Sequence, residues 1–302
     1  MSYEQLMQHA QEIEATAIKL STGTGTVPSA QPGQPDYVAH QQKFGVIAAF
    51  QPYTNIPQLG AFVPLIKVTH DVKASLSRGP DIKDPASNEL IRANPALDTM
   101  KDVARALDDW SGNAADEFRR NFIDPFDSYV HNQFALACIL EIELVALQAL
   151  WKSVRTDIDS IAEQTLMALD HLNDCHSQEW SVSWTVAACL AAIAAIPATG
   201  GASLTLEFVS AAAWVTAASP PAAPNAPTIG GSTVQGVISS MHSTIRMLGD
   251  RIDEQEQAIS RVLHQAILAA HADWRPFVAA RPALAAATAA NVTSRQFLGT
   301  PS

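Results

Sequence analysis

The densest group of residues able to bind a metal ion or exchange protons lies between residues 170 and 179. The stretch DHLNDCHSQE places His171 and Cys175 four residues apart, on one face of a predicted helix, with His176 next to them. Zinc accepts such donors, but a zinc site needs three or four converging ligands, and no second cluster in the sequence would complete it. We therefore expect no metal and no cofactor here, and a solvated helix end is the simplest interpretation.

The two histidines of this stretch suggest a second role, that of a pH switch. Protonation of His171 and His176 below about pH 6 would reduce the negative charge beside the apolar segment that follows them. This alternative and the solvated helix end both stay open at the level of the sequence.

Carboxylates inside an apolar stretch are the other candidates for chemistry. Glu141 and Glu143 would form a carboxylate site only if other carboxylates faced them, and the best candidates, Asp250 and Glu254, can pair with Arg246 instead. The sequence contains no serine nucleophile elbow, phosphate-binding loop, dinucleotide fingerprint or zinc-protease helix. It therefore predicts a protein that is not an enzyme, with no catalytic residues.

The composition favours closely packed helices. Hydrophobic residues make up 47% of the 302 residues and aromatic residues only 7%, with alanine, the best helix former, most frequent among the apolar types. The net charge of −11 argues against a nucleic-acid partner, which needs clustered lysine and arginine. The N-terminal stretch MSYEQLMQHAQEIEATAIKL lacks the features of a cleaved signal peptide. Three widely spaced cysteines give no disulfide framework.

The sequence of the first part of the chain predicts one helix followed by irregular structure. Residues 2–20 carry an apolar seam at spacings of four and three, and residues 21–35 form a breaker-rich linker. Residues 44–70 are apolar but contain Pro52, Pro57 and Pro64, which a long helix does not tolerate. We expect residues 44–70 to wrap irregularly over a helical body.

Two long helices with heptad seams dominate the rest of the sequence. The run from Phe126 to about Trp180 has no proline or glycine, and its seam is Leu144, Leu147, Trp151, Val154, Ile158 and Ile161. The second run, from Thr233 to Ala272, has the seam Ile238, Met241, Ile245, Leu248, Ile252, Gln255, Ile259 and Val262. Each narrow stripe needs a partner, so we predict an elongated all-α bundle in which these helices form an antiparallel coiled coil.

An apolar segment, residues 182–218, separates the two seams. It divides at PATGG into two arms that are each shorter than the roughly 20 residues of a membrane-spanning helix. In one interpretation this helical hairpin packs against the protein's own helices, against residues 44–70, or against a partner. In the other it inserts into membranes, and its membrane-contact residues are Val186, Leu190, Ile193, Ile196, Leu204, Phe208 and Trp214.

The stretch DDWSGNAADEF, residues 108–118, predicts a tight turn between two helices. An apolar periodicity leads to Trp110, and Asn113 is suited to cap a helix that starts at Ala114. Gly112 lets the chain reverse, and the indole of Trp110 is expected to bury a large area at the end of the apolar seam.

The predicted order of a helix, a Trp-X-Gly turn and a second helix resembles the WXG family of helical-hairpin proteins, which are exported by actinobacterial type VII (ESX) secretion systems. The matching residues are Trp110, Gly112, Ala114, Ala115, Phe118 and Phe122. The resemblance covers about residues 96–175, and the longer arrangement is similar to a longer actinobacterial member. It implies that the turn, through Trp110, Gly112, Ala115 and Phe118, forms part of a recognition surface for export. Family substrates often carry a Tyr-X-X-X-Asp/Glu signal, which is missing after Tyr129, so a partner chain would have to supply it.

From these features we predict five consecutive segments: residues 1–95, the hairpin at 96–180, the apolar hairpin at 181–218, a proline-rich linker at 219–232, and the returning helix with its tail at 233–302. The expected function is helix-mediated assembly, with a protein partner or as a homo-oligomer, in type VII secretion. The expected location is the cytoplasm before export and the exterior or cell surface afterwards. The alternative is a pore-forming or membrane-perturbing effector.

Overall fold

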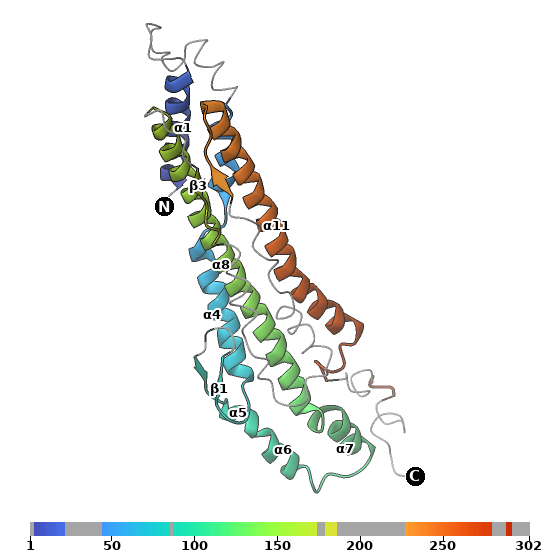
Figure 1. The fold of residues 1–302 in the computed structure, drawn as a ribbon. Coiled ribbons are helices and arrows are strands. Elements are labelled where there is room, and N and C mark those ends of the chain that lie inside the picture. The colour runs from blue at the N-terminus through green and yellow to red at the C-terminus, as the bar shows by residue number, and fades with distance from the viewer. Residues whose placement is uncertain are drawn as a thin grey trace. The chain divides into compact units, whose positions relative to one another are not determined.

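The computed structural model describes residues 3–21, 44–84, 87, 89–173, 179–185, 227–279 and 288–291. The chain forms two compact units, and Figure 1 labels their helices and strands. Within the described residues, unit 1 contains residues 3–21, 44–62, 146–173, 179–185 and 227–259, and unit 2 contains residues 63–84, 87, 89–145, 260–279 and 288–291. Helices α4 (Leu59–Leu76), α8 (Phe126–Asn173) and α11 (Val234–Ala272) each contribute a part to both units.

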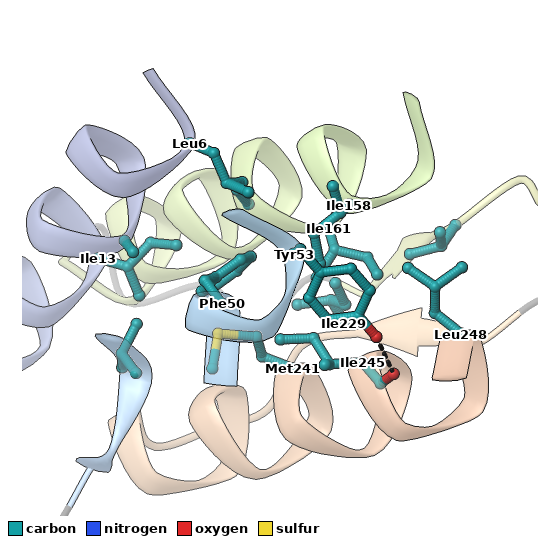
Figure 2. Packing of buried hydrophobic residues seen from close by; sticks show 14 of the residues in the cluster. Leu6, Ile13, Phe50, Tyr53, Ile158, Ile161, Ile229, Met241, Ile245 and Leu248 are labelled. Carbon is teal, nitrogen blue, oxygen red and sulfur yellow. Dashed lines mark hydrogen bonds between the residues drawn. The ribbon is translucent and has the colours of Figure 1, made fainter. Parts of the chain in front are cut away.

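Unit 1 is a helical bundle around one apolar core. Besides parts of α8 and α11 it contains α1 (Tyr3–Ser21), the short α3 (Val46–Phe50) and the 3-10 turn η1 (Gln51–Asn55). Figure 2 shows how side chains from all of these elements meet, with Phe50 of α3 between Ile13 of α1 and Met241 of α11. Burial of such side chains is the main favourable contribution to the stability of a bundle.

The heptad seams predicted for the long helices are confirmed in unit 1. On α8, Val154, Ile158 and Ile161 are at most 1% exposed, while Leu147 and Trp151 are partly buried against the same core. On α11, every seam position from Ile238 to Ile259 is buried. Figure 1 shows these parts of α8 and α11 running in opposite directions, as an antiparallel pair requires.

A buried hydrogen bond connects two elements of unit 1. The hydroxyl of Tyr53 donates a hydrogen bond to the carbonyl oxygen of Ile245, at 3.3 Å. Burial of this hydroxyl, together with the negative charges of Asp253 and Asp250, raises the pKa of Tyr53 to about 12, so the hydroxyl keeps its proton as a donor. The hydrogen bond ties η1 to α11.

A two-residue ladder brings together the chain segments that border residues 186–226. Strand β3 (Trp180–Ser181) pairs antiparallel with β4 (Thr228–Ile229). Next to β3, the buried carboxylate of Asp157 on α8 accepts hydrogen bonds from the backbone amide and the hydroxyl of Thr185, at 2.9 and 2.7 Å. The ladder therefore connects β3 to β4, and Asp157 connects the residues just after β3 to α8.

Unit 2 contains shorter elements between α4 and α8. Strands β1 (Ile82–Lys83) and β2 (Leu90–Ile91) pair antiparallel, with Ile82 opposite Ile91. After β2 come helices α5 (Pro95–Asp98), α6 (Met100–Ala106) and α7 (Asn113–Phe118), and then the π-helical turn η2 (Arg119–Ile123). Unit 2 also contains most of α4, the first part of α8, the end of α11, and residues 273–279 and 288–291.

The all-α fold class is confirmed, since the two small sheets are the exceptions in a structure made mostly of helices. Two expected boundaries are wrong. Residues 44–70 are largely helical: Pro57 lies before α4, and α4 continues through Pro64 although the backbone hydrogen bond that an amide at this position would donate is missing. Helix α8 does not reach Trp180, which pairs in β3. The two units also differ from the five consecutive segments predicted from the sequence, because each unit combines stretches that are far apart in the chain.

Candidate functional site

The Trp110 turn, residues 107–113, joins α6 to α7 in unit 2 (Figure 1). Gly112 has a φ of +100° and a ψ of 173°, a conformation that only glycine adopts without strain. The guanidinium of Arg119, in η2, donates a hydrogen bond to the carbonyl oxygen of Leu107 at 3.3 Å and lies 3.8 Å from the carboxylate of Asp108. The chain segments before and after the turn are thereby joined.

A row of aromatic rings follows the turn along η2 and the start of α8. Trp110 lies 5.9 Å from Phe118, Phe118 lies 5.2 Å from Phe122, and Phe122 lies 6.1 Å from Phe126, measured between ring centroids. Tilted rings at such distances attract one another. The guanidinium of Arg78 lies 5.7 Å from the ring of Phe126, at the end of the row. A π-helical turn such as η2 often marks a functional position in a helix.

Two details of the turn differ from the sequence prediction. Trp110 is not buried but 42% exposed, although its indole lies beside the ring of Phe118. The N-terminal cap of α7 is Gly112 rather than Asn113, and no side chain makes the capping hydrogen bond. Among the other motif residues, Ala115 is buried and Phe118 is half-buried. The turn therefore presents an aromatic ring to its surroundings.

Unit 2 exposes most of the large apolar side chains that lie at the surface. Of the thirteen such side chains that are exposed among the described residues, twelve belong to unit 2, and Met167 is the exception. On α4 the pattern is inverted, because Leu65, Val68 and Val72 face outward while Thr69 and Lys73 are buried. Exposed apolar surface of this extent is typical of a protein that binds a partner.

The buried face of α4 takes part in an ion cluster of four residues: His70, Lys73, Asp84 and Glu141. The Lys73 ammonium forms ion pairs with Asp84, next to β1, and with Glu141 on α8, the latter at 2.8 Å. His70 Nδ1 lies 3.2 Å from Asp84 Oδ2 and 3.9 Å from Glu141 Oε1. The side chains of Lys73, Asp84 and Glu141 are at most 2% exposed, so the cluster joins three elements inside unit 2.

The donor atoms of His70, Asp84 and Glu141 lie within 4.8 Å of one another, a spacing at which such groups can hold a metal ion. The ammonium of Lys73 pairs with both carboxylates, and a divalent ion would have to displace it. We therefore interpret the cluster as an ion-pair network. Asp250 and Glu254, the candidate partners of Glu141 in the sequence, are not members of this cluster.

Burial changes the acidity of three groups on this part of α8. The pKa of Glu141 is raised by burial, against the opposing effect of the Lys73 hydrogen bond. Burial also raises the pKa of Glu143 to about 7 and that of the Cys138 thiol to about 12. Cys138 is thus a neutral, unreactive thiol near physiological pH.

Several predicted site residues lie outside the described part of the chain. These are the membrane-contact residues Val186, Leu190, Ile193, Ile196, Leu204, Phe208 and Trp214, together with His176. His171 is described, and its ring lies 5.5 Å from the indole of Trp180 in unit 1. By length and composition, one described run of helix, Ala114–Leu172, could cross a membrane; its most apolar window has a mean hydropathy of 1.8 and is 39% buried. The core helix of a soluble protein meets the same criteria, so the run is weak evidence for a membrane span.

The ion cluster was missed because its members are far apart in the sequence. The signals that point to it are Lys73 on an otherwise apolar helix and Glu141 inside an apolar stretch, since such charges are buried only when they are paired.

Comparisons with protein-family models, with curated proteins and with solved structures give no match for this chain.

Proposed function

We propose that this protein is a non-enzymatic component of a type VII secretion pathway that works by helix-mediated assembly with a partner chain or with itself. The observation that carries the proposal is the Trp110 turn, in which Gly112 sets the reversal and an exposed indole leads a row of aromatic rings. An exposed tryptophan held in a fixed orientation is well suited to recognition, because aromatic side chains contribute much of the energy at binding surfaces.

The outward face of α4 supports the same proposal. Leu65, Val68 and Val72 follow the spacing of three and four residues through which one helix packs against another. A partner helix laid on this face would remove all three side chains from water. The partner would also carry the tyrosine-based signal that this chain lacks after Tyr129.

The proposal implies passage through the cytoplasm and a final position outside the cell or at its surface. The test is fractionation of the native host with and without the ATPase of its type VII system. We expect the protein in the extracellular or cell-surface fraction only when the ATPase is present. An unchanged distribution in the ATPase-deficient strain would refute the proposal.

A pair of matched variants connects the test to the turn. Trp110→Ala is expected to lower export or partner capture strongly, whereas Trp274→Ala, which removes another exposed indole of unit 2, is expected to leave both unchanged. Circular dichroism of both purified variants checks that their folds are intact. Equal losses in the two variants would indicate that the turn has no special role.

Membrane perturbation by residues 182–218 stays a separate prediction. It is tested by dye leakage from liposomes at pH 5 and pH 7, with Leu190→Glu as the variant that should abolish leakage. Leakage in neither condition would refute it.

A further inference from the structure

Helix α4 turns its apolar side away from the core of unit 2. Leu65, Val68 and Val72 are 52%, 60% and 43% exposed, whereas Lys73 is fully buried on the other side of the helix. Together with the exposed Ser75 they follow spacings of three, four and three residues, the pattern of a coiled-coil seam, and we call these four residues the α4 seam. A seam of this kind is half of a helix pair, because a second helix has to cover its aliphatic side chains before they leave water.

The charges beside the α4 seam indicate which helix fits it. Lys67 and Asp71 are the exposed charged residues of α4, and they form an ion pair with each other at 2.8 Å. This flank of α4 therefore has no net charge, whereas the whole chain has a net charge of −11. Two copies of an acidic chain repel each other, so we expect them to meet where the charges balance. An anionic membrane finds no excess of positive charge on this flank, and a basic peptide finds no excess of negative charge.

We propose that the α4 seam is a self-association surface, on which a second copy of this chain lays its own α4 in the antiparallel direction. In such a two-fold arrangement both copies use the same surface, and every contact occurs twice. An antiparallel register that packs Val68 of each copy on Val72 of the other also brings Lys67 of each copy beside Asp71 of the other. The two ion pairs within the helices then form one network of four charges across the interface.

The size of the α4 seam limits the strength of this contact. From Leu65 to Ser75 the seam is about 15 Å long at the helical rise. Interfaces that bury less than about 1,200 Å² are typical of weak or transient complexes. We therefore expect a reversible dimer with a dissociation constant in roughly the micromolar range. This inference rests on the self-assembly alternative of the proposed function and not on export, and it leaves the Trp110 turn for a partner chain that carries the tyrosine signal.

Sedimentation velocity of the purified full-length chain between roughly 1 and 100 μM tests the proposal. We expect the wild type to change from monomer to dimer across this range. Val68→Glu places like charges at the centre of the interface and should weaken the dimer by about tenfold or more. Val63→Glu is the matched control and should leave the dimer unchanged. Val63 is 58% exposed on the same helix, but it lies about 140° from Val68 around the helix axis.

Two charge variants distinguish contact between two α4 helices from other modes of association. Lys67→Glu leaves two negative charges beside the seam and Asp71→Lys leaves two positive charges, so each variant alone should dimerise about tenfold more weakly or worse. An equimolar mixture of the two should regain the wild-type affinity, because the negative flank of one variant meets the positive flank of the other. Native mass spectrometry identifies the heterodimer by its mass. Mixing would not restore association that was lost through misfolding, and circular dichroism checks each fold directly.

The proposal is wrong if the wild type stays monomeric throughout the concentration range, which is the result expected if a different protein or another segment of the same chain covers the α4 seam. It is also wrong if Val68→Glu dimerises as well as the wild type, or if Val63→Glu loses as much affinity as Val68→Glu. A mixture of the two charge variants that associates no better than either alone would overturn it as well. The export test uses the host strain, so none of these results decides that proposal.

Discussion

Glu143 offers the sharpest test of the electrostatics of unit 2. Its side chain lies on α8 among apolar neighbours and is 6% exposed, and burial raises its pKa from the ordinary 4.5 to about 7. A hydrogen bond from the backbone of Leu263 opposes this rise only in part. The substitution to examine is Glu143→Gln, which keeps the size of the side chain and removes the charge.

The expected change in the free energy of unfolding follows from the linkage between proton binding and folding. A rise from 4.5 to about 7 corresponds to roughly 3 kcal/mol, because one pKa unit is worth about 1.4 kcal/mol. The folded state binds the proton more tightly, so the contribution of Glu143 to stability is largest below pH 4.5 and falls as pH rises toward 7. We expect Glu143→Gln to be about 2–3 kcal/mol more stable than wild type at pH 8, and the gain to shrink to about 1 kcal/mol at pH 5.

The assay is urea unfolding at both pH values, followed by pulsed hydrogen exchange in peptides that cover residues 139–145 and 260–270. Peptide-level detection reports unit 2 separately from unit 1. Asp124→Asn, an exposed carboxylate that precedes α8, is the control and should change stability by less than about 0.5 kcal/mol at either pH. If Glu143→Gln is less stable than wild type at pH 8, the charged carboxylate is favourable in the fold and the reasoning from burial fails.

Three further predictions concern packing and the backbone. Gly112→Ala should destabilise unit 2 by about 1–3 kcal/mol in thermal unfolding, because its φ of +100° strains any side chain, although there is space for a Cβ atom. Gly60→Ala, with open space and no positive φ, should be neutral or stabilising and serves as its control. Leu150→Ala should cost about 2–5 kcal/mol, because the side chain is fully buried in the core of unit 1, and a loss below 1 kcal/mol in urea unfolding would contradict the packing. Tyr53→Phe should cost about 1 kcal/mol, since the hydrogen bond to Ile245 is lost, and an unchanged midpoint would show that the bond contributes little.

The helices with a single apolar seam could be predicted from the sequence. Periodicity alone located α1, most of α8 and α11, and the predicted seam residues of α11 from Ile238 to Ile259 are buried. Residues 44–70 could not be assigned in this way. The prolines suggested irregular structure, but Pro57 lies outside α4, and the helix continues through Pro64 at the loss of one backbone hydrogen bond.

The candidate site was predictable only in part. The Trp110 turn follows from local sequence, because a glycine after a tryptophan between two helical patterns permits the reversal. The exposure of Trp110 depends on which other segments cover the turn, and no local pattern determines that. The ion cluster joins residues 70, 73, 84 and 141, and only tertiary structure brings such separated charges together.

The ladder between β3 and β4 has a consequence for engineering. Because Trp180 pairs with Ile229 and Asp157 holds Thr185, the exit and re-entry points of residues 186–226 are neighbours on unit 1. A glycine-rich bridge between those points would have only a short distance to span, so it would cost little additional loop-closure entropy. The same two points are where a fluorescent reporter or an affinity tag would be inserted.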